Sequence, residues 1–536
     1  MREISTCRTA VGHAPGRWRS LLRSLLILGF CWIEVALALA QSTPDVGASD
    51  DPLRREFLTP PESAKPRAWW HWMNGNITED GIRRDLEWMH RIGIGGVQNF
   101  DASLDTPQFV NKPLAFMTAP WQDAFRYAAT LSDELELELA IASAPGWSES
   151  GGPWVAPEDG MKKLVWTETQ IAGGASFTGK LPHPPTVIGP FQNASIDRSG
   201  ESNPPTNEPI HEVYADVAVI AYKLPRAEPS MTELNPTVTS SAGPIESERL
   251  WDGDFTHSVH LPYGSKGKPA WIQVDFGRPR IVQSMSLGLL QSWELLDARH
   301  DGAELQASRD GVTFHTVATA YNTAEQSLSE DAPPIEETVT FAPVAAQYFR
   351  LLLPTPPVRQ ISPVVANWLW LGPIPKEHQV TEFVLHRSPR VDHFEQKAAF
   401  FLDAGINPHS TRHVPPGEAL QWTQIFDLTS RLRADGTLNW TPPPGRWAVL
   451  RLGYSLLGIT NHPASPEGTG LEVDKLDPTA VKAYMDAYLG RYASMLGPKL
   501  IGSHGLRAIV NDSWEAGPQN WTPELLAEFT DRKSVV

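Results

Sequence analysis

Alternating strand and helix signals between residues 68 and 142 constrain the fold more than any other feature of the chain. Apolar residues at helical spacing separate short apolar runs that end in glycine, asparagine or aspartate. The pattern predicts, in order, a strand at Ala68–Met73, a helix with Ile82, Leu86 and Met89 on its inner face, a strand at Ile94–Phe100, a helix at Trp121–Glu134 and a strand at Leu135–Ala142. Consecutive strand–helix units pack as a parallel sheet, so this region predicts an α/β fold of the (β/α)8 barrel type.

The same alternation resumes near the end of the chain. Gly445–Tyr454 is predicted to be a further barrel strand, Asp477-Pro478 to start a helix, and Leu506–Val510 to be a strand buried on both faces. Thr522, followed by proline, is predicted to cap the next helix. About five barrel strands are therefore expected, in segments 41–165 and 441–531. We expect the barrel to be truncated there, the end at 532–536 to be aberrant, and the 536-residue chain alone to be catalytically silent.

Between these segments, residues 166–440 change to period-2 alternation with many prolines, which predicts inserted β-structure. Four of its segments resemble a discoidin-like jelly roll, of the F5/8 type C or galactose-binding-like kind, at about residues 236–354. They are Leu250–Gly253, Trp271–Gly277, Ala303–Gly311 and Tyr348–Leu353. Such modules bind glycans in some enzymes and act as spacers in others, and both roles stay open.

Residues 1–40 have the order of a secretory signal peptide: a basic start, an apolar core and small residues before a cleavage site after Ala40. A membrane anchor is the alternative, but Glu34 interrupts a run that is already short for a membrane-spanning helix. Both cysteines, Cys7 and Cys31, lie in this leader, so the mature protein relies on no disulfide. We expect a secreted or periplasmic protein without a membrane segment after cleavage.

The charge of the chain argues against nucleic-acid partners. The leader holds five basic and two acidic residues, so its removal changes the formal charge from −17 to −20. A polyanion needs a basic surface, which such a chain lacks. Twenty tryptophans instead favour aromatic surfaces, of the kind that hold sugar rings.

Two carboxylates and an indole follow the strand predicted at Leu506–Val510, namely Asp512, Glu515 and Trp514. Catalytic residues of parallel α/β folds lie at the carboxyl ends of strands, which favours a catalytic role over the alternative of a capped and solvated loop. Other polar or aromatic residues at predicted strand ends are expected to bind substrate, although each alone has a structural alternative. They are His71, Asn74, Asn76, Asp101 and Trp147.

Five motifs resemble glycoside hydrolase family 106, the α-L-rhamnosidases, over roughly Phe57 to Phe529. They are Trp69–Asn76, Gly93–Gln98, Pro145–Trp154, Thr469–Lys475 and Asp512–Glu515. The resemblance implies a calcium-dependent, inverting enzyme whose (β/α)8 catalytic domain is interrupted by β-domains. It implies that Glu515 is one of two catalytic glutamates, and it places the second beyond residue 536.

Inversion needs an acid and a base roughly 6.5 to 9.5 Å apart, so Asp512 is too near Glu515 in sequence to be its partner. Asp512 is interpreted as a like-charged neighbour that favours the protonated form of Glu515, or as a group that holds substrate or metal. Glu472 and Asp474 are the candidate Ca²⁺ ligands, because calcium prefers oxygen, with a solvated loop as the alternative.

Two other functions stay open from the residues alone. One is a non-catalytic carbohydrate-binding protein that uses the jelly roll, and the other is a glycosidase of different sugar specificity on the same scaffold. The partner expected in each case is a carbohydrate, and the oligomeric state is undetermined.

Overall fold

The computed structural model describes residues 51–104, 106–194, 210–224, 228–265, 268–290, 302–320, 335–355, 376–400, 414 and 417–532. The predicted signal peptide and the residues from 533 onward lie outside these ranges. The chain divides into two compact units, Met1–Pro66 and Arg67–Val536. In the first unit, the side chain of Asp51 accepts a hydrogen bond from the Leu53 amide and caps helix α2 (Pro52–Leu58), and a short 3-10 turn follows at Glu62–Ala64.

A four-stranded parallel sheet carries the α/β pattern of the second unit. Its order is β1 (Arg67–Met73), β2 (Gly96–Ala102), β3 (Glu138–Ala142) and β17 (Leu506–Val510). Each neighbouring pair is parallel, as predicted for strand–helix units. The strands expected at the two ends of the sequence thus meet in one sheet, although four parallel strands are present in the described residues rather than about five.

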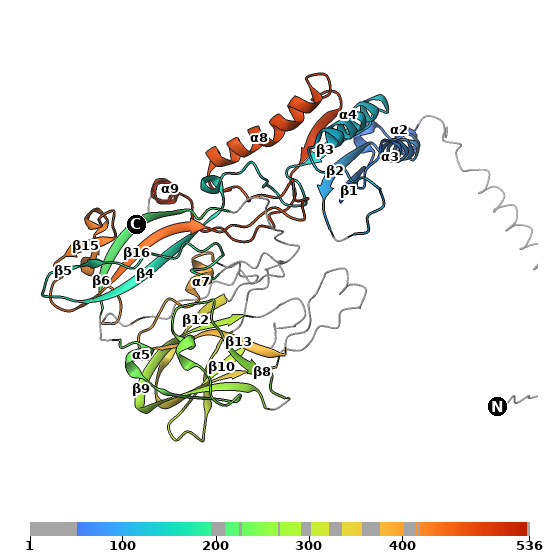
Figure 1. Ribbon diagram of the computed structural model, residues 1–536. Helices are drawn as coiled ribbons and strands as arrows, with labels where there is room; N and C mark the ends of the chain where they lie inside the picture. The colour runs from blue at the N-terminus through green and yellow to red at the C-terminus, as the bar shows by residue number, and fades with distance from the viewer. Residues whose placement is uncertain are drawn as a thin grey trace, which may run out of the picture. The chain divides into compact units, whose positions relative to one another are not determined.

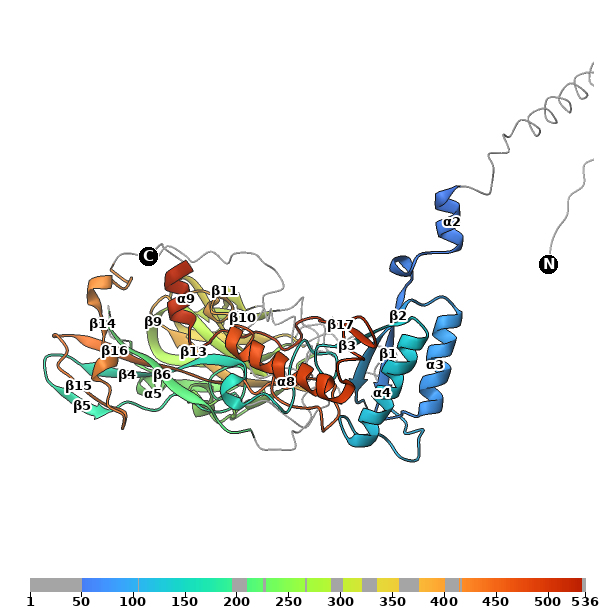
Figure 2. The same cartoon turned by 90° about the horizontal axis from the view of Figure 1, so that it is seen from above.

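Three long helices accompany this sheet: α3 (Glu79–Arg91), α4 (Ala119–Glu134) and α8 (Pro478–Leu496) (Figure 2). The predicted caps are confirmed, because the Thr78 hydroxyl accepts from the Gly81 amide and the Asp477 carboxylate accepts from the Thr479 amide. The predicted inner face of α3 is buried as well. Aromatic rings dominate the shared core; Trp121 stacks on Phe125 with centroids 5.2 Å apart.

An antiparallel sheet contains the strand that was predicted at Gly445–Tyr454, so its assignment to the barrel is wrong. This strand is β16 (Arg446–Leu456), and it pairs antiparallel with β4 (Lys162–Ala172) and β6 (Tyr214–Lys223) (Figure 1). β14 (Ile425–Asp427) extends the sheet, and β5 (Phe177–Lys180) pairs with β15 (Thr437–Trp440) beside it. A short apolar run does not reveal the direction of its neighbours, which is why the sequence pattern misassigned this strand.

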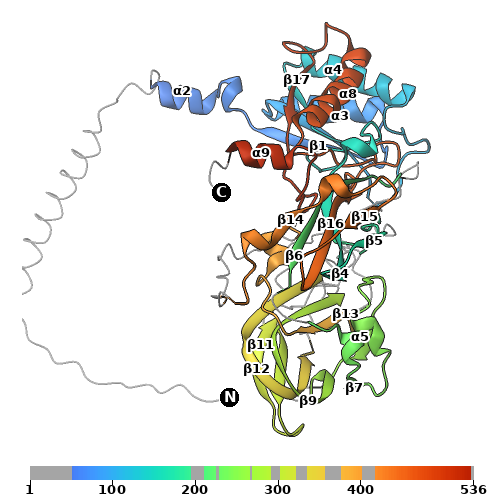
Figure 3. The ribbon, with the colours of Figure 1, turned by 90° about the vertical axis from the view of Figure 1, so that its left-hand side faces the viewer.

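A seven-stranded sheet forms a separate β-structure with its own apolar core (Figure 3). Its strands are β7 (Thr237–Ser240), β8 (Val259–Pro262), β9 (Ala270–Leu290), β10 (Ala303–Ser308), β11 (His315–Ala320), β12 (Ile335–Leu353) and β13 (Glu377–His386). The predicted strand segments at 271–277, 303–308 and 348–353 pair in it. The sheet continues to His386, past the predicted boundary at 354, and its resemblance to a discoidin-like module stays a prediction.

Short helical elements complete the described chain. They are α5 (Met231–Leu234), α7 (Phe394–Lys397), α9 (Leu525–Arg532) and the 3-10 turns Pro157–Asp159, Ser247–Leu250, Trp422–Gln424 and Thr429–Arg431. None of the helices described in the structure has the length and apolar character needed to cross a membrane.

Two local predictions around β17 are wrong. Ile509 is 39% exposed, because β17 pairs with β3 alone among the described strands and is not buried on both faces. Thr522 does not cap α9 with its side chain; its hydroxyl donates to Asp474 Oδ2 over 3.0 Å. The Asp474 carboxylate, 48 residues away in sequence, binds the hydroxyl that would otherwise cap the helix. Local sequence spacing cannot show such a contact.

Candidate active site

The carboxyl ends of β1, β2, β3 and β17 lie along one edge of the parallel sheet, because all four strands run the same way. The loops that follow them carry most residues predicted for the site. The loop after β3 also contacts the loop after β16, since the Trp147 amide donates to the His462 carbonyl over 3.0 Å. The edge of the sheet is therefore where the sequence-distant segments meet.

His71 and Trp147 come together at this edge. Their ring centroids are 5.9 Å apart and the rings are perpendicular, at 81°. The His71 ring also contacts Phe100, with centroids 5.3 Å apart, and burial lowers the pKa of His71. At neutral pH this histidine is therefore an uncharged, partly buried member of an aromatic group that could face a sugar ring.

Asp101 is buried at the end of β2, where it is 7% exposed. Burial raises its pKa to about 7, opposed by a hydrogen bond of 2.9 Å that Trp121 Nε1 donates to Oδ2, while the charge of Glu467 adds to the rise. The Gly146 amide donates to the Asp101 carbonyl over 2.7 Å. Asp101 thus joins the second strand to the glycine-rich loop and carries a carboxyl that titrates near neutral pH.

Asn74 and Asn76, predicted to bind substrate, use their side chains to shape the loop that follows β2. The Asn74 amide donates to Thr106 Oγ1 over 2.7 Å and accepts from the Leu104 amide over 2.7 Å. Asn76 Oδ1 accepts from the Phe109 amide over 2.8 Å. These three contacts show that both asparagines position a loop at the edge of the site.

Ser513 donates hydrogen bonds to both carboxylates of the Asp512–Glu515 segment. The Ser513 amide donates to Asp512 Oδ1 over 2.8 Å, and the Ser513 hydroxyl donates to Glu515 Oε1 over 2.9 Å. Glu515 is exposed, and Trp514 is 45% exposed. An accessible carboxylate beside an accessible indole suits the binding and cleavage of a sugar ring.

Trp514 is fixed from two sides. Its Nε1 donates to the Gly517 carbonyl over 2.7 Å, and Lys475 Nζ lies 5.2 Å from the ring centroid. A cation at this distance interacts favourably with an indole ring. The contact connects the Asp512–Glu515 segment to the predicted motif at Thr469–Lys475.

Glu149 is a residue of this edge that the sequence reasoning did not select. Asn511 Nδ2 donates to Glu149 Oε1 over 3.2 Å, and the Ser143 hydroxyl lies 2.6 Å from the Glu149 carbonyl. Glu149 Oε2 is buried and accepts no hydrogen bond from the residues that the structure describes. The position of Glu149 in the glycine-rich loop after β3 was the sequence signal that could have identified it. Its hydrogen bond to Asn511, the residue before Asp512, connects that loop to the Asp512–Glu515 segment.

Glu472 and Asp474, the candidate metal ligands, form buried ion pairs with lysines. Glu472 is 1% exposed and accepts from Lys475 Nζ over 2.6 Å, and Asp474 is fully buried and accepts from Lys162 Nζ over 3.1 Å. The alternative of a solvated loop is therefore wrong. A buried carboxylate needs a cationic or hydrogen-bonding partner, and lysines fill that role here. Carboxylates whose charge a lysine already balances do not fit a Ca²⁺ site.

No group of three or more histidine, cysteine, aspartate or glutamate side chains within the described ranges is arranged to hold a metal ion. The structure therefore assigns no calcium ligands. Calcium dependence, which the family resemblance implies, stays a prediction.

Carboxylates and indoles along the carboxyl edge of a parallel α/β sheet are the arrangement of a glycoside hydrolase. The model of glycoside hydrolase family 106, described as alpha-L-rhamnosidase, matches residues 58–535, so this chain belongs to that family. The predicted family resemblance is confirmed.

Two known proteins are similar over most of the chain. The solved structure of a rhamnosidase from Novosphingobium sp. PP1Y is 41% identical, with a TM-score of 0.73, and the match covers 91% of this chain and 42% of that one. A curated protein of Formosa agariphila, named "Putative beta-glucuronidase", is 23% identical over 503 residues, which are 94% of this chain and 27% of that protein. The chain thus spans less than half the length of either relative.

Proposed function

We propose that the protein carrying this chain hydrolyses terminal α-L-rhamnosides with inversion of configuration, and that Glu515 is one of its two catalytic carboxylates. The observation that carries the proposal is the match to the rhamnosidase family across residues 58–535, together with the exposed Glu515 at the carboxyl edge of the parallel sheet. The solved rhamnosidase at 41% identity supports the same substrate class.

In the proposed reaction, one carboxylic acid protonates the glycosidic oxygen, and a carboxylate on the opposite side of the ring removes a proton from the attacking water. Glu515 takes one of these roles. Trp514 supplies a face for the sugar ring, and Asp512 shares Ser513 with Glu515 and so orients the segment. His71 and Trp147 line the same edge and are proposed to contact the substrate.

Replacement of Glu515 with glutamine tests the role of this residue. Glutamine keeps the shape and the hydrogen bond from Ser513 but transfers no proton, so we expect kcat on an aryl α-L-rhamnoside to fall roughly 10²- to 10⁴-fold. Glu524→Gln is the matched control, because Glu524 is exposed in the turn that precedes α9, and it should keep normal turnover. Unchanged turnover in Glu515→Gln would remove Glu515 from the mechanism.

A glycosidase of different sugar specificity is the second candidate, because the curated relative carries the name of a glucuronidase. A panel of aryl glycosides that includes α-L-rhamnoside and β-D-glucuronide separates the two. Faster cleavage of the glucuronide would favour this second candidate. Export by a signal peptide and glycan binding by the seven-stranded sheet remain further parts of the proposal.

A further inference from the structure

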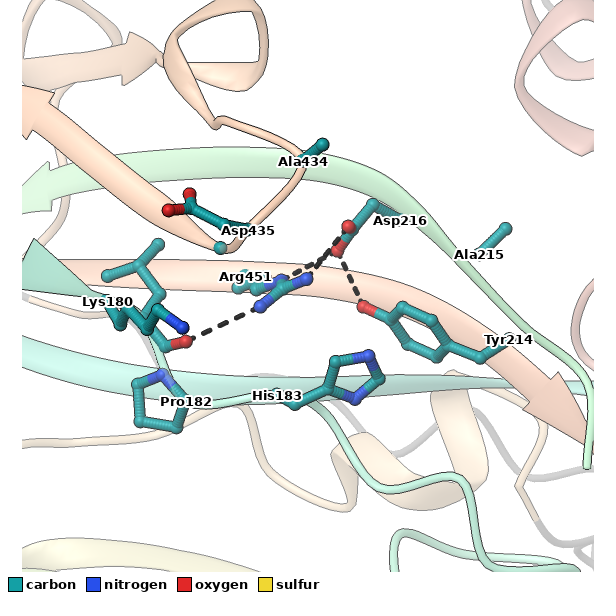
Figure 4. A pocket seen from close by; sticks show the side chains of 11 residues that line it. Lys180, Pro182, His183, Tyr214, Ala215, Asp216, Ala434, Asp435 and Arg451 are labelled. Atoms are coloured by element: carbon teal, nitrogen blue, oxygen red, sulfur yellow. Dashed lines mark hydrogen bonds and ion pairs between the residues drawn. The ribbon is translucent and has the colours of Figure 1, made fainter.

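A cavity of about 640 Å³ is lined by residues of β6 and β16, of the end of β5 with the segment that follows it, and of the turn before β15. The strands of the parallel sheet contribute none of its lining residues. Figure 4 shows the polar and aromatic side chains around it. Six of the lining residues have charged or aromatic side chains: Lys180, His183, Tyr214, Asp216, Asp435 and Arg451. Its volume falls in the range of roughly 300 to 1,000 Å³ that is usual for small-molecule sites.

Arg451 and Asp216 form a rigid polar centre of the cavity (Figure 4). Arg451 Nε donates to Oδ1 over 2.7 Å and Nη2 to Oδ2 over 2.9 Å, while Nη1 donates to the Leu181 carbonyl over 3.4 Å. A guanidinium carries five N–H donors, so at least one is left for a hydroxyl group in the cavity. Asp216 Oδ1 also accepts from the Tyr214 hydroxyl, whereas Oδ2 accepts from Arg451 Nη2 alone among the described residues. Oδ2 therefore keeps a second lone pair, and the Arg451–Asp216 pair offers both a donor and an acceptor in fixed positions.

Tyr214 supplies a fixed aromatic wall. Its hydroxyl donates to Asp216 Oδ1 over 2.6 Å, and its ring lies 4.1 Å from the His183 ring, centroid to centroid. The ring also lies directly against the backbone of β16, because a Cβ atom at Gly453 would come within 2.5 Å of it. A ring held by three contacts loses little freedom when a ligand binds, which favours affinity.

The charges around the cavity balance. Lys180 and Arg451 are cationic, and Asp216 and Asp435 are anionic. An anionic ligand would meet two carboxylates, and a cationic ligand two cations. Fixed donors and acceptors beside an aromatic wall instead suit a neutral ring with hydroxyl groups at its edge and C–H groups on its face.

We propose that this cavity binds a neutral pyranose unit of a glycan at a site separate from Glu515. The inference rests on the proposed function, in that a glycan is taken as the substrate. β16 connects the two sites, since Arg451 lies in the cavity and Leu456, five residues further, precedes the loop that reaches His462 and the active-site edge. Five residues of strand correspond to roughly 17 Å between Arg451 and Leu456, where the loop to the active-site edge begins. The cavity is therefore a second site and not an extension of the site around Asp512 and Glu515.

The test uses ¹⁹F NMR of the 536-residue chain with its ten tyrosines replaced by 3-fluorotyrosine. The resonance that disappears in Tyr214→Phe belongs to Tyr214, and Tyr222→Phe, on the same strand but outside the cavity, is the matched assignment control. L-Rhamnose and D-galactose are titrated as neutral probes and D-galacturonate as the anionic probe. We expect the Tyr214 resonance to shift saturably with a neutral sugar and not with galacturonate.

His183→Ala should weaken the binding of the neutral sugar about tenfold, because it removes one aromatic face of the cavity. His183 is exposed, so its replacement leaves the core intact; His315→Ala, also exposed but on β11, should leave the binding unchanged. A Tyr214 resonance that responds to neither neutral sugar, or to galacturonate alone, would overturn the proposal. So would an unchanged affinity in His183→Ala.

Hydrolysis of an aryl α-L-rhamnoside is measured separately on the protein that carries the chain. A saturable Tyr214 response without hydrolysis would support the cavity and contradict the proposed activity. Hydrolysis with no Tyr214 response would contradict the cavity alone. The two proposals can therefore fail independently.

Discussion

The carboxyl group of Asp101 is buried and accepts a hydrogen bond from Trp121, and with a pKa of about 7 it is close to half-protonated at neutral pH. Burial raises its pKa to about 7, and the Trp121 hydrogen bond does not offset this. Between the unfolded pKa of about 4 and the folded pKa, the folded state holds a proton that the unfolded state has lost. Stability therefore falls as pH rises through this window, by about 1.4 kcal/mol per pH unit for this group.

Asp101→Asn should remove that dependence. Asparagine keeps an acceptor for Trp121 Nε1 but does not titrate, so the variant should lose less stability than the native protein between about pH 4 and pH 7. Denaturant unfolding at a series of pH values measures the difference. Asp123→Asn, on the exposed side of α4, is the control and should keep the native slope. Parallel pH profiles for Asp101→Asn and the native protein would contradict the raised pKa.

For single residues of the site, the sequence predicted the position but not the side-chain contacts. Positions at strand ends could be selected from the sequence, and the structure places His71, Asp101 and Trp147 at one edge. What each side chain contacts could not be predicted. Asp474 pairs with a lysine 312 positions earlier, and no local pattern carries that information.

At the scale of elements, the loops around the site are in backbone contact. A Cβ atom at Gly470 would lie 2.1 Å from the carbonyl carbon and oxygen of Gly152, so the segment before Glu472 passes directly over the glycine-rich loop after β3. Asn461 fixes the same segment, because its Oδ1 accepts from the Gly470 amide over 2.9 Å. Position 470 therefore requires glycine, because the backbone of Gly152 leaves no space for a side chain.

Gly470→Ala should destabilise the protein by about 1 to 3 kcal/mol, since the backbone of either loop must shift to admit a methyl group. Gly490→Ala is the matched control. Gly490 lies inside α8 with open space around its Cα, so alanine there should stabilise the helix by about 1 kcal/mol. The midpoints of thermal unfolding compare the two, and equal midpoints for Gly470→Ala and the native protein would refute the contact.

The helices were the most predictable elements, because caps and apolar spacing are local signals. α3 and α8 begin at the predicted caps. The strands of the parallel sheet pair in the predicted direction, but the partners of β16 were not predicted. β16 carries a run that suits either a parallel or an antiparallel sheet, and the strands on both sides of it decided the outcome. Pairing between distant segments is the part of the fold that the periodicity leaves undetermined.

At the scale of the whole molecule, calcium dependence stays a prediction from the family resemblance, because the described residues contain no group of side chains arranged to hold a metal ion. EGTA should abolish rhamnoside hydrolysis by the protein that carries the chain, and added Ca²⁺ should restore it. Thermal unfolding is followed alongside activity, because a structural calcium elsewhere would change stability as well. Full activity after exhaustive EGTA treatment would exclude a calcium requirement.

We propose above all that an inverting rhamnosidase uses Glu515. The most direct measurement is ¹H NMR of the anomeric signals during hydrolysis of an aryl α-L-rhamnoside by the protein that carries this chain, before the released sugar equilibrates. Inversion predicts that β-L-rhamnose is the first product, and that Glu515→Gln releases it roughly 10²- to 10⁴-fold more slowly. α-L-Rhamnose as the first product, or native speed in Glu515→Gln, would contradict the account.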